Sequence, residues 1–166
     1  LQDVTDRHAM ETELRRINER QHSILENMPC AISAFDADLR LVAWNTEFVR
    51  LLDLGGLFVH GVPTFEDIIR YNALRGEYGD GDIDAVVAEA IARARNPVPH
   101  RFERVRPNGK PLEVRGTPMP GGGFVTTYTD MSERKLAEQA IARNANLLRG
   151  AIDAVDEAFV LFDPDD

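Results

Sequence analysis

The stretch Gly123-Phe-Val-Thr-Thr-Tyr-Thr-Asp-Met-Ser-Glu-Arg134 contains two different patterns, one directly after the other. After its first glycine, the part up to residue 129 consists of β-branched and aromatic residues, which favour a strand. Ser132 is followed by Glu133, and a hydroxyl side chain with an acid behind it is typical of the positive end of a helix. The stretch therefore predicts a strand that passes directly into a helix near Ser132.

This junction occurs twice in the chain. When the sequence is compared with itself so that residue 3 meets residue 130, Asp3-Val-Thr-Asp-Arg7 falls on Asp130-Met-Ser-Glu-Arg134. Without any gap, Phe35-Asp36 then falls on Phe162-Asp163. Such a repeat indicates similar structural units in series, and we expect the chain to be a piece of a longer protein. The predicted segments are 1–7 as the end of a preceding module, 8–28 as a connector helix, 29–131 as one complete module, 132–151 as a second connector helix, and 152–166 as the start of a following module.

Both connectors carry apolar residues spaced three and four apart, which is the heptad pattern of a coiled coil. Asn144 occupies a core position of the second connector, where a buried Asn often sets the register of paired helices. The alternative is an amphipathic helix that packs on its own module. We favour a parallel homodimer, in which the seam residues expected to meet are Leu14, Ile17, Ile24, Ile141, Asn144 and Leu148.

The complete module is expected to begin with a hairpin. Met28-Pro29 ends the first connector, because the residue before a proline avoids helical geometry. Two short strands are predicted at 30–35 and 39–44, joined by a turn. Asn45 is placed to cap the helix that follows, and Gly55-Gly56 is expected to end that helix.

The second half of the module is expected to carry helices and then strands. Helical periodicity runs over 65–74 and 83–94. Strands are predicted at 100–106 and 111–117, which flank an Asn-Gly turn, and at 123–129. Five antiparallel strands with helices grouped on one face define an α+β fold.

The composition excludes several classes of protein. The net charge of -9 argues against binding nucleic acid or an anionic membrane surface, since both need an excess of basic residues. Cys30 is the only cysteine, so an internal disulfide is excluded and a reducing compartment fits best. No apolar run reaches the roughly 20 residues that a membrane helix needs. We therefore expect a cytoplasmic module without nucleic-acid or direct membrane contact.

Four stretches, in this order, resemble the PAS family over residues 24–134. They are Leu25 to Asp36 with Leu41-Val-Ala-Trp-Asn45, Arg101 to Lys110, Gly122 to Asp130, and Asp130-Met131-Ser132. The last resembles the Asp-Ile-Thr exit motif that joins a PAS sheet to its output helix, and Asp3-Val4-Thr5 is a closer match still. The resemblance implies a PAS fold in which Asp130 and Ser132 couple the last strand to the output helix. Asp3 and Thr5 are the repeat copies of these two residues.

The stretch from Arg70 to Gly79 resembles a PAS subgroup common in bacterial sensor histidine kinases, often hybrid ones. This resemblance implies a non-catalytic sensory or relay domain of a two-component system, with adjacent PAS and kinase modules as partners. One alternative is a ligand-free module for dimerisation or scaffolding. Another is the input domain of a diguanylate cyclase. The chain has no room for the phospho-accepting helix and ATP-binding domain of a kinase.

In PAS domains a ligand pocket lies between the sheet and the central helices. The candidate lining residues are Trp44, Tyr71, Asn72, Arg75, His100 and Arg115. The alternative is that the two aromatic residues belong to the core and the arginines are solvated or paired.

No cofactor is evident from the sequence, and an unidentified small molecule remains compatible with the pocket. Cys30 lies on the first predicted strand rather than on a helix, so a flavin-cysteine adduct is not supported. Residues 82–95 contain no histidine, so haem ligation there is not supported either. The four histidines lack metal-ligand spacing, so we expect no metal site.

Overall fold

The structure is a computed structural model that describes residues 2–160. Within that range the chain forms six helices and five strands. Their bounds are α1 Gln2–Glu26, β1 Ala31–Phe35, β2 Leu41–Trp44, α2 Thr46–Leu51, α3 Gly55–Phe58, α4 Phe65–Leu74, α5 Ile83–Arg95, β3 His100–Val105, β4 Pro111–Pro118, β5 Phe124–Asp130 and α6 Ser132–Val160. The chain divides into two compact units, one up to Asp130 and one from Met131 onward, and α6 makes up the described part of the second.

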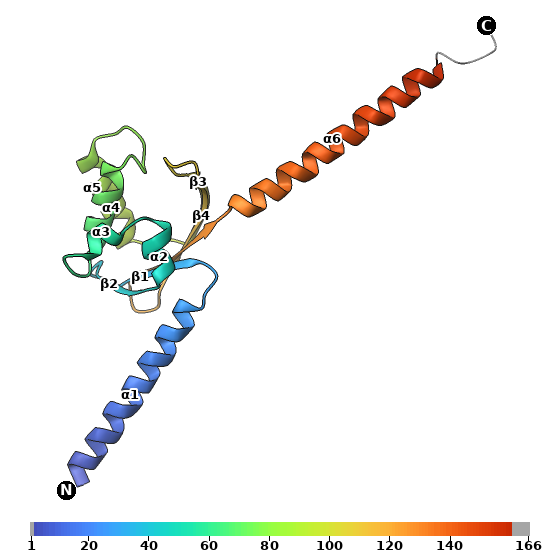
Figure 1. The fold of residues 1–166 in the computed structure, drawn as a ribbon. Coiled ribbons are helices and arrows are strands. Elements are labelled where there is room, and N and C mark those ends of the chain that lie inside the picture. The colour runs from blue at the N-terminus through green and yellow to red at the C-terminus, as the bar shows by residue number, and fades with distance from the viewer. Residues whose placement is uncertain (1, 161–166) are drawn as a thin grey trace. The chain divides into compact units, whose positions relative to one another are not determined.

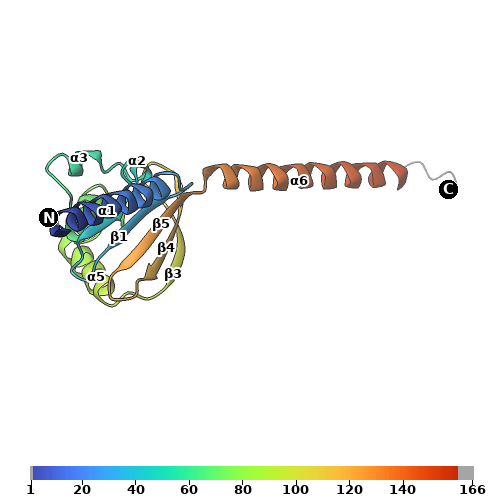
Figure 2. The ribbon, with the colours of Figure 1, turned by 90° about the horizontal axis from the view of Figure 1, so that it is seen from below.

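The strands of the first unit form one antiparallel sheet in the order β2-β1-β5-β4-β3. Figure 2 shows β1, β5, β4 and β3 side by side in this order. β5 therefore lies in the middle of the sheet and pairs with β1 on one side and β4 on the other. Helices α2 to α5 follow β2 in the chain and precede β3 (Figure 1). This is the α+β arrangement that the sequence predicts, with both hairpins where they were expected.

The hydrophobic core lies between one face of the sheet and helices α2, α4 and α5. At one end of the core the rings of Phe35, Phe65 and Phe124 contact one another, with centroids 5.2 to 5.6 Å apart. Phe48 of α2 is fully buried and lies 5.7 Å from the ring of Tyr128 on β5. Burying such rings contributes about 2 kcal/mol each, so these contacts fix α2 and α4 against the sheet.

Both ends of α2 are defined by hydrogen bonds. Asn45 caps the first turn as expected, because its side chain accepts from the backbone N–H of Phe48. At the other end, the Leu54 N–H donates to the Val49 carbonyl (2.8 Å), and Asp53 takes a left-handed conformation with φ 54°. This is a Schellman motif, which ends the helix without a glycine.

Gly55-Gly56 was expected to end α2, and this expectation is wrong. The two glycines instead begin α3, because the left-handed turn at Asp53 has already ended α2 at Leu51. The sequence pattern pointed to glycine as the natural helix terminator, whereas the aspartate adopts the same conformation here.

The long helices differ from their expected bounds. α1 begins at Gln2, so Asp3 and Thr5 lie inside its first two turns rather than before its start. α6 begins at Ser132, as expected, and continues through 152–160, where a following module was predicted to start. The residue that matches Pro29 in the repeat is Asp156, so the proline that ends α1 has no counterpart in α6. The repeat pair Phe162-Asp163 lies outside the described residues, and the predicted module boundaries stay predictions.

Candidate functional site

Three of the six predicted pocket residues come together on α4 and its C-terminal cap. The Arg75 guanidinium lies over the Tyr71 ring, 4.3 Å from its centroid, and donates to Asn72 Oδ1 at 2.6 Å. Asn72 is buried, and its Nδ2 lies 3.5 Å from the Tyr78 hydroxyl. A cation over an aromatic face is attractive, so these side chains hold one another in place.

The other three predicted residues lie elsewhere. Trp44 packs at the edge of the core, with its ring 5.6 Å from the Phe58 ring. His100 pairs with Gly116 across β3 and β4, whereas Arg115 pairs with Arg101. Because partners in an antiparallel pair share a face and neighbours along a strand alternate, His100 and Arg115 point to opposite faces of the sheet. The structure therefore does not bring the six residues together, and a shared pocket stays a prediction.

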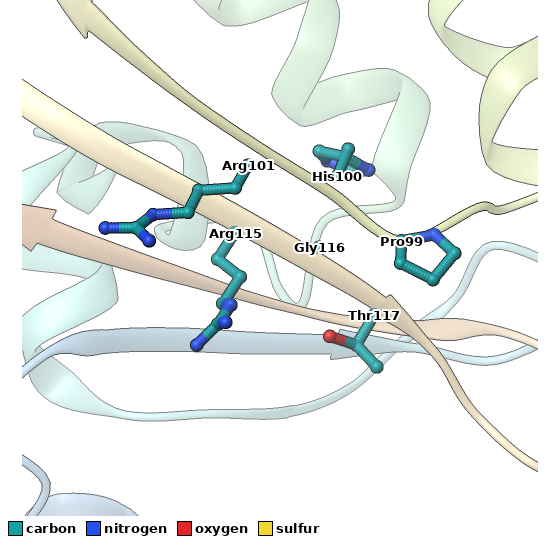
Figure 3. A pocket seen from close by; sticks show the side chains of 6 residues that line it. All are labelled: Pro99, His100, Arg101, Arg115, Gly116 and Thr117. Carbon is teal, nitrogen blue, oxygen red and sulfur yellow. The ribbon is translucent and has the colours of Figure 1, made fainter.

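A hollow of about 400 Å³ lies against β3 and β4. It is lined by Pro99, His100, Arg101, Arg115, Gly116 and Thr117, and Figure 3 shows the His100 ring on the opposite side of the strands from Arg115. The His100 ring occupies the space that a Cβ at Gly116 would need, which explains the glycine there. Arg101 is already engaged by the Glu113 carboxylate (2.9 Å from Nε), so its charge is balanced within the hollow.

A cluster of charged side chains holds the C-terminal end of α2. Arg75 donates to the carbonyl oxygens of Leu52 (2.8 Å) and Asp53 (3.0 Å). Arg106 donates to the carbonyl oxygens of Leu51 and Leu52. The last carbonyls of a helix lack partners inside the helix and carry a partial negative charge, so two guanidinium groups are well suited to this place.

Glu77 balances these arginines from inside the protein. Its carboxylate accepts from Arg106 Nε (2.9 Å) and Nη2 (2.6 Å), and the side chains of both residues are almost completely buried. Its second oxygen lies 3.1 Å from Arg104 Nη1, as an ion pair without hydrogen-bond geometry. Arg106 also pairs with the exposed Asp53 carboxylate at 3.1 Å.

The Arg106 guanidinium stays charged in this setting. Burial on its own lowers the pKa of Arg106, but the hydrogen bonds and charges of Glu77 and Asp53 outweigh burial and raise it. The cluster therefore ties three parts of the chain together: the end of α2, the segment that follows α4, and the residues that follow β3. Of this cluster, only Arg75 is among the residues predicted from the sequence.

Polar groups also lie on the core face of the central strands. Ser33 on β1 pairs with Thr126 on β5, and both are buried. Tyr128 lies on the same face of β5, and its pKa is raised to about 12. Burial is the main cause and nearby Tyr78 adds to it, whereas the adjacent Ser33 hydroxyl and the charge of Arg104 act in the opposite direction. The phenol thus stays neutral and packs beside the buried Phe48.

The predicted exit residues lie where the sheet meets the second unit in the chain. Asp130 is the last residue of β5 and pairs with Leu112 of β4. Its negative charge contributes to the raised pKa of Arg50 on α2, after the larger effects of the hydrogen bond and charge of Glu47. Ser132 is the first residue of α6. The coupling role of these residues stays a prediction.

The predicted seam residues are exposed on both long helices. The exposed fractions are 57% for Leu14, 43% for Ile17 and 59% for Ile24 on α1, and 70% for Ile141 and 66% for Leu148 on α6. Asn144 is exposed as well. A shallow apolar groove of about 240 Å³ on α6 is lined by Leu148, Ala151, Ile152 and Val155. The seams therefore present apolar surface that the described chain does not cover.

Residues 2–160 contain neither a metal-binding cluster nor a membrane-spanning helix. No group of three or more histidine, cysteine or carboxylate side chains is placed to hold a metal ion there. Over the same range, no helix has the length and apolar character needed to cross a membrane.

Comparison with known proteins identifies the family. A family model described as the PAS fold matches residues 25–139. Because this match spans more than half of the chain, the protein belongs to the PAS family. Members of this family are signal-sensing domains without catalytic activity of their own, and the fold is the one that the sequence predicts.

The chain is similar to solved structures of low sequence identity. The PAS domain of BvgS from Bordetella pertussis has a TM-score of 0.50 and 18% identity, covering 86% of this chain and 98% of that one. The PAS domain of an HTR-like protein from Haloarcula marismortui has a TM-score of 0.45 and 18% identity, covering 74% and 98%. A domain of a sensory box sensor histidine kinase/response regulator from Geobacter sulfurreducens has a TM-score of 0.43 and 17% identity, covering 70% and 96%. No curated protein matches the chain significantly.

Proposed function

We propose that this chain is a sensory or relay module of a sensor histidine kinase, and that it passes a signal from its sheet to the output helix α6. One observation carries the proposal: the central strand β5 ends at Asp130, and α6 begins two residues later at Ser132. A strand that pairs on both sides responds to changes in either neighbour, and the backbone carries that response directly into the helix. The assignment to a histidine kinase is supported by the resemblance of residues 70–79 to that PAS subgroup.

The exposed seams support a homodimer in which α1 and α6 each pair with their copy in a second chain. Apolar residues at heptad spacing that stay exposed in a single chain mark a surface for another helix. The alternative, that α1 lies with its seam on its own module, does not account for the exposure of Leu14 and Ile24. In such a dimer, a signal changes the balance between two arrangements of the paired helices.

The coupling step is tested by replacing Asp130 and Ser132 with alanine in the full-length parent protein. The expected result is an output that no longer follows the signal, measured as autophosphorylation with and without the stimulus. Asp80→Ala, at an exposed position in the loop between α4 and α5, is the matched control and leaves the response intact. An unchanged response in the double variant would remove the coupling claim.

The dimer is tested on the chain itself. Ile141→Glu combined with Leu148→Glu places like charges in the predicted seam and is expected to raise the monomer fraction in sedimentation equilibrium. Arg143→Glu with Arg149→Glu changes the same number of residues on the same helix outside the seam, and is expected to leave the association unchanged. Equal association of both variants would argue against the seam.

A second candidate function is a ligand-free assembly module. It is favoured by the filled core, where the rings of Phe35, Phe65 and Phe124 contact one another and Phe48 packs beside Tyr128. Native mass spectrometry of the purified chain separates the two functions, since a specific bound small molecule supports sensing and an empty dimer supports assembly.

A diguanylate cyclase is the alternative parent protein. The sequence that follows residue 166 in the parent decides between a kinase output and a cyclase output.

A further inference from the structure

One buried amide joins α1, β1 and α2. The Asn45 side chain accepts hydrogen bonds at Oδ1 from the backbone N–H groups of Phe48 (3.0 Å) and Ile32 (3.1 Å). Its Nδ2 donates to the carbonyl oxygens of Leu25 (3.0 Å) and Cys30 (2.8 Å). The residue is 1% exposed, and these contacts use both donors and both lone pairs of the amide. The opposite orientation would set NH₂ against two N–H groups, so the surroundings fix the amide.

A second contact joins the same two helices. Both carboxylate oxygens of Glu26, the last residue of α1, lie 3.1 Å from the backbone nitrogen of Thr46, the first residue of α2. An acid at the positive end of a helix is favourable. The last turn of α1 is therefore attached to the first turn of α2 through Asn45 and through Glu26.

The far end of α2 is attached as well. Arg106 follows β3 directly and donates to the carbonyl oxygens of Leu51 and Leu52 at the end of α2. The hairpin that contains Arg106 leads into β4, and β4 pairs with β5 from Leu112 to Pro118. α2 has six residues, so the two attachments are separated by about 9 Å.

We propose that α2 transmits movement of α1 to the hairpin between β3 and β4, and that Asn45 is the positioning residue at the input of this connection. This inference rests on the proposed relay function, and it adds the path by which a signal from α1 reaches the sheet. A short helix held at both ends by hydrogen bonds, and packed in its middle through the buried Phe48, moves as one piece. A displacement of the last turn of α1 then reaches the residues around Arg106.

The test measures backbone amide hydrogen exchange in the intact chain for the variants Asn45→Asp and Asn45→Ser. Both keep an oxygen that can cap α2. Asn45→Asp removes both donors to the carbonyls of Leu25 and Cys30, and Asn45→Ser replaces the two amide donors with one hydroxyl on a shorter side chain. We expect exchange to become about tenfold faster in the last turn of α1, and also in residues 106–110 of the distant hairpin, because buried carbonyls lose their partners.

The two variants differ in their response to pH. In Asn45→Asp the new carboxyl group faces two carbonyl oxygens, so protonation at low pH restores one donor and reduces the defect, whereas the defect of Asn45→Ser does not change. The titratable groups on the surrounding elements are His22 and Glu26 on α1, Cys30 before β1, and Glu47 and Arg50 on α2. The unmodified chain is therefore measured over the same pH range and its response subtracted.

Thr64→Ala is the matched control, since it removes the capping box of α4 without touching α2. Faster exchange confined to α4 is expected for this control. If Asn45→Asp fails to fold, Glu26→Ala tests the same connection from α1, and Glu26→Gln, which keeps an acceptor, is expected to have a smaller effect than Glu26→Ala.

The outcomes separate the inference from the proposed function. Faster exchange at the end of α1 with an unchanged hairpin at 106–110 overturns the role of α2. The relay function would still stand in that case if the Asp130 and Ser132 variant of the parent loses its response. A hairpin that responds to Asn45→Asp, together with a parent that ignores changes at Asp130 and Ser132, upholds the connection and removes the relay function.

Discussion

The first turn of α2 is held mainly by a neutral amide, whereas its last turn is held by charged groups. At the first turn, the buried Asn45 amide satisfies all of its hydrogen-bonding groups with backbone partners. At the last turn, Arg106 and Arg75 donate to helix carbonyls, and Glu77 supplies the opposite charge. The first turn depends mainly on hydrogen-bond geometry, with the Glu26 carboxylate as its one charged contact described above, whereas the last turn depends on charge balance in addition.

This difference determines how each end responds to change. A buried ion pair has a large desolvation cost, and removing one partner leaves an uncompensated charge inside the protein. A buried amide that loses its partners leaves unpaired polar groups, which costs less. The charged end of α2 is therefore expected to tolerate substitution less well than the neutral end.

The largest effect is expected for Glu77→Gln. The substitution keeps the shape and one acceptor, but leaves the Arg106 charge buried without a counter-charge beyond the exposed Asp53. The free energy of unfolding is expected to fall by about 3 kcal/mol, measured by urea denaturation. Glu113→Gln breaks an ion pair to the exposed Arg101 and is expected to cost less than about 1 kcal/mol. Equal costs for the two variants would contradict the charged description of this end.

A smaller loss of stability is expected at high pH, from Tyr128 on β5, whose ring packs against Phe48 of α2. Burial raises the pKa of Tyr128 from 10 to about 12, so the unfolded chain loses this proton at a lower pH than the folded chain. The stabilisation from the neutral phenol is complete below pH 10 and is lost as the pH rises toward 12, by about 2 kcal/mol.

Urea denaturation between pH 8 and pH 12 measures this loss of stability. Tyr128→Phe keeps the ring beside Phe48 and removes the ionising group, so part of the decline in stability should disappear in this variant. If the variant and the unmodified chain decline in parallel over this range, the phenol does not titrate as described.

The smallest effect is expected at Asp53, where two contributions oppose each other. Its left-handed backbone favours glycine by about 1 kcal/mol, whereas its carboxylate pairs with Arg106. Asp53→Gly is expected to be more stable than Asp53→Ala by about 1 kcal/mol in thermal or urea denaturation, since both lose the pair and only glycine relieves the backbone. A reversed order would show that the turn is not strained.

Local patterns in the sequence were sufficient to predict the strands and the presence of the long helices, but not the bounds of those helices. The β-branched run that forms β5, the Asn-Gly turn after β3 and the apolar spacing of α5 each depend on neighbours within a few residues. Asn45 was predicted as a helix cap for the same reason. Its bonds to Leu25 and Cys30 could not be predicted, because the path of α1 next to β1 is a tertiary feature.

The charged cluster was missed for a related reason. Glu77 and Arg106 lie 29 residues apart, and nothing in their local sequences pairs them. By contrast, the sequence was sufficient to predict that His100 and Arg115 lie on opposite faces of the sheet. Once the hairpin register is assumed, the alternation of side chains along the strands places them there. The end of α2 was misplaced because a left-handed aspartate gives no local signal as strong as a pair of glycines.

The central position of β5 in the sheet limits the kinds of movement by which this strand can transmit a signal. A slip of β5 by one residue would break the ladders to both β1 and β4 and would turn Phe124, Thr126 and Tyr128 out of the core. Sliding is therefore too costly to serve as a signal. β5 can still change its twist, and this change passes to the residues that follow it. We therefore expect the output of α6 to respond to rotation about the axis of β5 and not to translation along that axis.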